Sequence, residues 1–70
     1  MPKKIAFAGA GNMGGAILRG LLSAGKNPGE ILFYEPFEKT AMSVEELGAI
    51  RYHDFGKMAN DADVIFLCVK

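Results

Sequence analysis

Apolar residues occur along the chain in short continuous runs, and these runs alternate with longer segments of helical periodicity. Runs of this kind, only four to six residues long, are typical of buried strands. They cover residues 4–8, 31–34, 49–52 and 64–69. In the segments between them apolar residues recur three or four positions apart, which is the spacing of one helix face. The pattern therefore predicts four strands separated by three helices.

The three predicted helices are bounded by capping and breaking residues. The first covers residues 13–24, where bulky and small residues form two neighbouring ridges, and the small ridge would let the helix approach a sheet closely. Pro36 is suited to the first position of the second helix, and Gly48 is expected to close that helix. Asp54 is expected to cap a short third helix that ends near residue 60.

Strict alternation of strands and helices predicts the α/β class with the order βαβαβαβ. Such alternation is typical of a parallel sheet with right-handed crossovers. The run 64–69 is apolar on both faces, so we expect it in the middle of the sheet. A doubly wound domain normally has about five or six strands. The chain is thus predicted to form a Rossmann-like parallel sheet with alternating helices, truncated after the fourth strand.

Composition and charge exclude several classes of protein. The chain has 70 residues, of which 50% are hydrophobic and 23% charged, as in folded globular proteins. Its net charge of zero gives no basic surface for nucleic acid or an anionic membrane. No apolar stretch reaches the roughly 18 residues of a membrane span. Cys68 is the single cysteine, so no disulfide can form within the chain. A free cysteine is expected in a protein of the reducing cytoplasm.

Four of the nine glycines lie between residues 9 and 15, where the first strand meets the first helix. Residues 9–14 read Gly-Ala-Gly-Asn-Met-Gly and match the pattern G-x-G-x-x-G. In that pattern Gly9 permits the tight turn, Gly11 leaves room for a pyrophosphate, and Gly14 lets the helix pack close to the sheet. Amides at the helix N-terminus then hold the phosphates. The motif predicts a dinucleotide site, and the alternative is a glycine-rich turn without a ligand.

An acidic residue follows the motif at the distance that a dinucleotide site requires. Glu35 ends the second predicted strand, 21 positions after Gly14, and its carboxylate would accept hydrogen bonds from the adenosine ribose. The same charge would repel the 2′-phosphate of NADPH, and Lys39 in the following helix would offset part of that repulsion. We therefore expect both dinucleotides to be used, with a tilt toward NADH.

The other reactive side chains predict neither a catalytic residue nor a metal ligand. Cys68 lies in an apolar strand and lacks the neighbouring base that a catalytic thiol needs. His53 stands alone, with no second ligand at metal-binding spacing. Arg19 is expected to face solvent on the first helix.

The run KIAFAGAGNMGGAILRGLLSAG, together with ADVIFLCVK near the end, resembles the N-terminal part of pyrroline-5-carboxylate reductase. The resemblance covers essentially the whole chain, and its most specific parts are GNMG, AI, RGLL and the final VK. It implies reduction of the cyclic imino acid 1-pyrroline-5-carboxylate to L-proline with NADPH or NADH, in proline biosynthesis. It also implies a C-terminal helical domain, absent from these 70 residues, that holds the substrate and forms a homo-oligomer. Residues 1–70 would then be the N-terminal part of a dinucleotide-binding domain, inactive alone.

Residue by residue, the resemblance carries over contacts to the cofactor alone. Asn12 and Met13 join the glycines of the pyrophosphate loop, and Pro36 lies with Glu35 near the ribose or the 2′-phosphate. Val69 and Lys70 match the end of a strand that, in the family, lies beside the nicotinamide half of the cofactor. The predicted cofactor-binding residues are Gly9, Gly11, Asn12, Met13, Gly14, Glu35, Pro36, Val69 and Lys70.

Two departures from the family leave the choice between NADH and NADPH open. Phe55 stands where relatives often carry a polar residue near the adenosine, and Glu35 stands where several carry a neutral one. The glycine motif is also shared with other families. The alternatives are another NAD(P)-dependent oxidoreductase, such as an F420-dependent NADP oxidoreductase or a β-hydroxyacid dehydrogenase, and a non-catalytic nucleotide-sensing domain.

Overall fold

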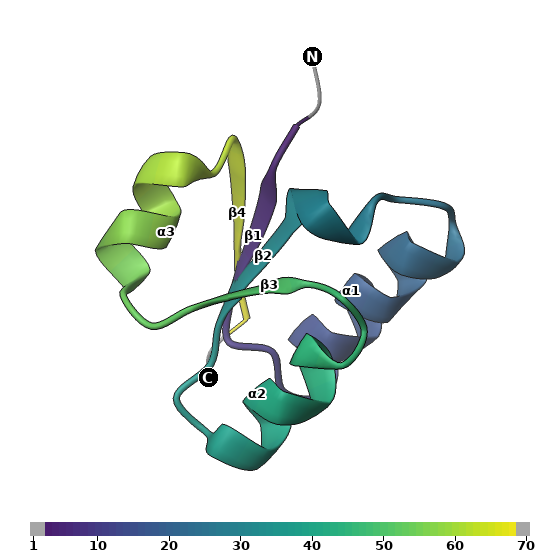
Figure 1. The fold of residues 1–70 in the computed structure, drawn as a ribbon, viewed down its shortest axis with the longest axis horizontal. Coiled ribbons are helices and arrows are strands. Elements are labelled where there is room, and N and C mark those ends of the chain that lie inside the picture. The colour runs from purple at the N-terminus through teal and green to yellow at the C-terminus, as the bar shows by residue number, and fades with distance from the viewer. Residues whose placement is uncertain (1–2, 69–70) are drawn as a thin grey trace.

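The computed structural model describes residues 3–68, in which one parallel sheet carries helices on both faces (Figure 1). The predicted order βαβαβαβ is confirmed, with one additional 3-10 turn before the second strand. Along the chain the elements are β1 (Ile5–Ala8), α1 (Asn12–Ser23), η1 (Pro28–Glu30), β2 (Ile31–Tyr34), α2 (Glu38–Glu45), β3 (Ile50–Tyr52), α3 (Phe55–Asp61) and β4 (Val64–Leu67).

The four strands lie in the order β3-β2-β1-β4, and all neighbours run parallel. β1 is central, and Ile5 at its start is opposite Ile31 of β2 and Val64 of β4. The chain moves outward from β1 to β2 and β3 and then returns to pair β4 with the other side of β1. The loop after β1 therefore lies where the strand order reverses, which is the usual place for a ligand in an open α/β sheet.

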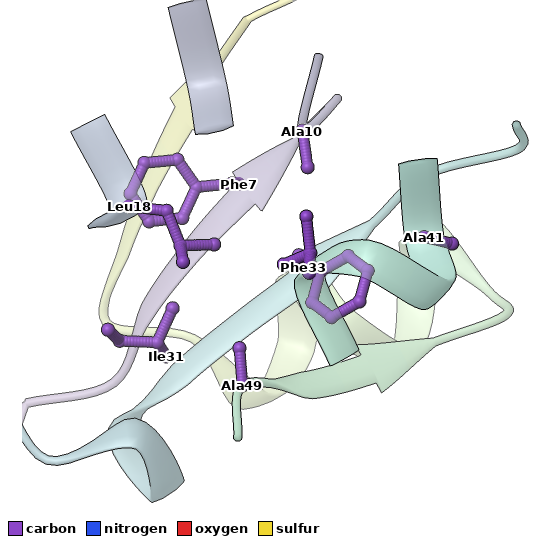
Figure 2. Packing of buried hydrophobic residues seen from close by; sticks show 8 residues of the cluster. Phe7, Ala10, Leu18, Ile31, Phe33, Ala41 and Ala49 are labelled. Atoms are coloured by element: carbon purple, nitrogen blue, oxygen red, sulfur yellow. The ribbon is translucent and has the colours of Figure 1, made fainter. Parts of the chain in front are cut away.

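The two faces of the sheet are packed by different helices. α1 and α2 cover one face, where Phe7, Leu18 and Phe33 belong to the larger buried cluster (Figures 1 and 2). α3 covers the other face, where Met58 packs against alanines of β1 and Leu32 of β2. Successive residues of β1 thus point to opposite faces, as the two-residue period of a strand requires. None of the helices within residues 3–68 has the length and apolar character needed to cross a membrane.

Residues 3–68 form four strands, and the expected place of residues 64–69 in the middle of a larger sheet stays a prediction. β4 ends at Leu67 and lies at the edge of the sheet, where it pairs with β1. Its apolar side chains are 37% to 72% exposed, although the ring of Phe66 stacks on Phe7 with 5.3 Å between centroids. An apolar run indicates that a strand can be buried on both faces, but it does not say which strands lie beside it.

The second helix also begins later than predicted. α2 starts at Glu38 with Phe37 as its N-cap, so Pro36 precedes the helix instead of occupying its first position. Phe37 has extended backbone angles, and its N–H donates to Glu35 Oε2 at 2.9 Å. This hydrogen bond keeps the loop non-helical for the three residues between the strand and the helix. At the other end α2 stops at Glu45, before the Gly48 that was expected to close it.

The predicted cap of the third helix is confirmed, and it provides a stability test. Asp54 Oδ1 accepts a hydrogen bond from the N–H of Lys57 at 3.1 Å. Asp54→Ala should lower the free energy of unfolding by about 1 kcal/mol, because an amide of the first turn loses its acceptor. Urea unfolding of the full-length protein would measure this loss. Asp54→Asn keeps a side-chain oxygen and should cost less, so an equal loss in both variants would contradict the capping role.

Candidate dinucleotide-binding site

The glycine motif forms the loop between β1 and α1, at the carboxyl end of the central strand. Gly9 has a φ of 95°, a left-handed conformation that glycine adopts without steric cost. Its N–H donates to the carbonyl oxygen of Tyr34 at 2.8 Å, which ties the start of the loop to the end of β2. The N–H of Gly15 donates to Gly11 at 2.7 Å and closes the first turn of α1. The motif therefore has the predicted strand–turn–helix context.

Gly11 and Gly14 differ in the space around them. A Cβ added to Gly14 would collide with the carbonyl oxygen of Gly9 and lie 3.1 Å from the Cβ of Cys68. This agrees with the expectation that Gly14 lets the helix pack closely against the sheet. A Cβ at Gly11 would meet no atom within 4 Å. Gly11 is exposed, so the space above it is open to a ligand.

The N-terminus of α1 is open to an anion. Gly11 is the N-cap and has no side chain with which to accept a hydrogen bond, and the first turn holds no acidic residue. The leading amides of a 12-residue helix and its positive dipole end thus point toward the space at Gly11. Met13, also predicted to belong to the loop, is 70% exposed on the same turn.

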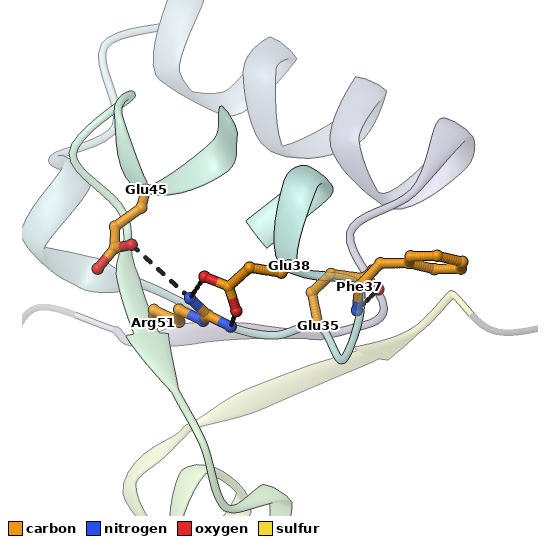
Figure 3. A network of polar contacts seen from close by, with 5 residues as sticks. All are labelled: Glu35, Phe37, Glu38, Glu45 and Arg51. Carbon is orange, nitrogen blue, oxygen red and sulfur yellow. Dashed lines mark hydrogen bonds and ion pairs between the residues drawn. The ribbon is translucent and has the colours of Figure 1, made fainter. Parts of the chain in front are cut away.

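Glu35 is buried between two loops. Only 9% of the residue is exposed, and Oε1 accepts a hydrogen bond from the N–H of Ala10 at 2.8 Å. Oε2 accepts from the N–H of Phe37 at 2.9 Å (Figure 3). The carboxylate therefore connects the glycine loop with the loop between β2 and α2. Its expected contact with a ribose stays a prediction.

A mainly apolar cavity of about 570 Å³ lies at the carboxyl ends of β1, β2 and β4. Three aromatic residues contribute to its lining. The rings of Tyr34 and Phe55 are tilted against each other with 6.1 Å between centroids, and Phe37 is 75% exposed. Pro36 and Glu35, both predicted site residues, also line it. A concave apolar space of this size suits a flat aromatic group such as a nucleobase.

A second cavity, of about 520 Å³, lies between α1 and α2 and reaches Gly11. It is lined by the cations Arg19 and Lys39 and by the hydroxyls of Thr40 and Ser43. The chemistry of this lining suits a phosphate group. Lys39 was considered from the sequence, whereas Arg19 was expected only to face solvent.

Residues that sequence reasoning missed come from the segment after β2. Phe37 could have been noticed in the sequence, because it is a large aromatic residue two positions after Glu35 at the end of β2. Thr40 and Ser43 are three positions apart on a helix, so they share a face, but that spacing alone does not indicate a cavity. Arg19 reaches this cavity only because the sheet brings α1 and α2 together.

An ion-pair network fixes α2, which carries part of the second cavity. Arg51 of β3 donates two hydrogen bonds to Glu38, at 3.0 and 2.9 Å, and its guanidinium lies 4.0 Å from Glu45 (Figure 3). The hydrogen bonds and the charge of Arg51 hold the pKa of Glu38 below its usual value. One arginine thus connects both ends of α2 to the sheet edge.

Three predicted contacts cannot be placed. Val69 and Lys70 lie outside the described residues, and so does the side chain of Asn12. Within the described part of the chain, no cluster of three or more His, Cys, Asp or Glu residues is arranged to hold a metal ion.

Comparison with known proteins places the chain in a family. The family model described as NADP oxidoreductase, coenzyme F420-dependent, matches residues 4–70. The chain belongs to this family. Membership confirms the predicted cofactor class, NADPH or NADH, and the α/β fold of a dinucleotide-binding domain.

Individual known proteins are similar to nearly the whole chain. The pyrroline-5-carboxylate reductase of Escherichia coli K12 is 43% identical over 72 residues, which covers 100% of this chain and 27% of that enzyme. The enzyme of the same name from Corynebacterium melassecola is 36% identical over 67 residues, which covers 94% of this chain and 25% of that enzyme. The solved structure of the pyrroline-5-carboxylate reductase of Coxiella burnetii superposes with a TM-score of 0.90 at 30% identity. The match covers 99% of this chain and 26% of that enzyme. The resemblance predicted from the sequence is confirmed, and the chain spans about a quarter of these relatives.

Proposed function

We propose that these residues are the N-terminal dinucleotide-binding part of a pyrroline-5-carboxylate reductase, which reduces 1-pyrroline-5-carboxylate to L-proline with NADPH or NADH. The observation that carries the proposal is the open, uncapped N-terminus of α1 at Gly11, at the end of the central strand. The similarity of the chain to reductases of that name supports the choice of substrate.

The two cavities suggest how this chain would hold the cofactor. The amides at the start of α1 would bind the pyrophosphate, and the aromatic residues Phe37 and Phe55 would enclose the adenine. The second cavity, with Arg19 and Lys39, is suited to the 2′-phosphate of NADPH. The bound nicotinamide supplies the hydride, and the role of this chain is to orient it.

The remaining parts of the proposal concern the rest of the enzyme. A helical C-terminal domain would hold the cyclic imino acid and form a homo-oligomer, and the protein would act in the cytoplasm. The support is that the matched relatives are about four times longer than the aligned region. Because the imino acid would be held by that domain, we expect residues 1–70 alone to show no turnover.

An F420-dependent NADP oxidoreductase is the second candidate, since the family's description contains that activity. It differs from the first candidate in the substrate and not in the dinucleotide fold. A β-hydroxyacid dehydrogenase and a nucleotide-sensing domain without turnover complete the alternatives.

Steady-state assays of the full-length protein would separate these functions. With 1-pyrroline-5-carboxylate we expect oxidation of NADPH or NADH and one L-proline formed for each cofactor consumed. Parallel assays should contain reduced F420 with NADP⁺, or a β-hydroxyacid with NAD(P)⁺. Turnover in one of the parallel assays but not with 1-pyrroline-5-carboxylate would overturn the reductase proposal. Dinucleotide binding without turnover in any of the three assays would favour the sensing domain.

A further inference from the structure

The carboxylate of Glu35 is engaged by the protein's own backbone, although the residue also lines the apolar cavity. Its two oxygens accept hydrogen bonds from two amides, one on each of two loops, and the residue is only 9% exposed. We propose that Glu35 is a positioning residue, which holds the glycine loop and the β2–α2 loop in the relative placement that a dinucleotide needs. This inference rests on the proposed function, because it assigns the residue a role in the same site.

The hydrogen bonds of Glu35 join segments that are far apart in the sequence. Ala10 is 25 residues before Glu35, and it belongs to the loop that receives the phosphates. Hydrogen bonds to an ionised carboxylate are stronger than those between neutral groups, and a buried carboxylate needs such donors. The neighbouring Gly9 is tied to the end of β2 as well, through the carbonyl oxygen of Tyr34 at 2.8 Å. Two consecutive residues of the glycine loop are thereby fixed against β2.

The geometry also divides the amides of the glycine loop into two groups. The N–H of Ala10 is consumed by Glu35, so it is not a donor to a bound phosphate. The amides that follow Gly11 have no side-chain acceptor from the N-cap and remain for the ligand. Glu35 therefore acts on the phosphate site through the loop, without contacting the phosphates.

A positioning role changes the expectation for cofactor preference. The tilt toward NADH depended on a Glu35 carboxylate that faces the ribose diol and repels a 2′-phosphate. Both oxygens instead have amide partners, which offset their charge. Discrimination between the two dinucleotides would then depend on Arg19 and Lys39, which line the cavity between α1 and α2.

The test is the dissociation constant of the full-length protein for NADH and for NADPH, measured by titration calorimetry. In Glu35→Gln an amide group replaces one oxygen and leaves one backbone N–H without an acceptor. We expect both dissociation constants to rise together by about tenfold, the cost of one such hydrogen bond. Glu35→Ser, which removes the whole carboxylate, should likewise weaken both without changing their ratio. If Glu35 instead contacted the ribose, its loss would raise the dissociation constant for NADH and lower the one for NADPH.

Glu46→Gln is the matched control, since it removes the same charge from an exposed side chain just beyond the last turn of α2. Glu46 lines neither of the two cavities, so both dissociation constants should stay near those of the wild type. A shift of the NADH-to-NADPH ratio in the Glu35 variants beyond that of Glu46→Gln would overturn the positioning role.

Amide hydrogen exchange of the ligand-free wild type adds a readout that needs no variant. The amides of Ala10 and Phe37 should be protected before any dinucleotide is added, and they should exchange faster in Glu35→Gln. Fast exchange of both amides in the wild type would overturn the inference, whether or not the variants fold. If the wild type binds neither dinucleotide, the proposed function itself fails, which is a distinguishable result.

Discussion

Gly14→Ala is expected to lower the free energy of unfolding by about 3 kcal/mol or more, because the new methyl group has no space. The Cβ would collide with the carbonyl oxygen of Gly9 and lie 3.1 Å from the Cβ of Cys68. The Gly9 carbonyl belongs to the backbone of the glycine loop, so it cannot swing aside like the end of a flexible side chain. The start of α1 would have to move away from the sheet, and affinity for a dinucleotide would fall with it.

Gly20→Ala in the same helix is the matched control for this variant. A Cβ at Gly20 meets no atom within 4 Å, so alanine there should stabilise the protein by up to about 1 kcal/mol through helix propensity alone. Urea unfolding of the full-length variants and titration with NADPH would give both quantities. If Gly14→Ala unfolds at the same urea concentration as the wild type, close packing at Gly14 is not required.

Local sequence signals predicted most of the elements correctly. Each of the four apolar runs contains a strand, because each run is short and is followed or preceded in the sequence by a helical segment. Asp54 was identified as a cap because an N-cap needs only a side-chain oxygen close to the first-turn amides. Such signals depend on neighbours within a few residues, which the sequence displays directly.

Features that depend on distant neighbours could not be predicted in the same way. The apolar character of β4 shows what its faces can contact, but it does not show that β4 pairs with β1, the strand most distant from it in the sequence. The position of Glu35 at a strand end was predictable, but its two amide donors were not. One of these donors is on a loop 25 residues away, and that loop reaches Glu35 only when β1 and β2 are paired.

The cavity with Arg19 and Lys39 illustrates the same limit for the site. Its cations come from two helices that the chain places on one face of the sheet. In the sequence Lys39 could be proposed because it lies in the helix that follows Glu35, whereas Arg19 is an ordinary polar residue of an exposed helix face. The glycine motif is contiguous, and its strand–turn–helix context could be tested against the neighbouring pattern. The centre of the candidate site and Lys39 were therefore predictable, whereas Arg19 was not.

Gly11→Ala is expected to weaken binding of NADH and NADPH about 10- to 150-fold, or about 1.5–3 kcal/mol, while the fold stays intact. No protein atom lies within 4 Å of the Cβ that alanine would add at Gly11. The methyl group would instead fill the open space at the N-terminus of α1, where a phosphate would meet the helix amides. Titration calorimetry of the full-length variant with each dinucleotide would measure the loss, and thermal unfolding without ligand should match the wild type. Unchanged affinity would mean that the phosphates bind away from this loop, whereas a lower melting temperature without ligand would point to a structural role for Gly11.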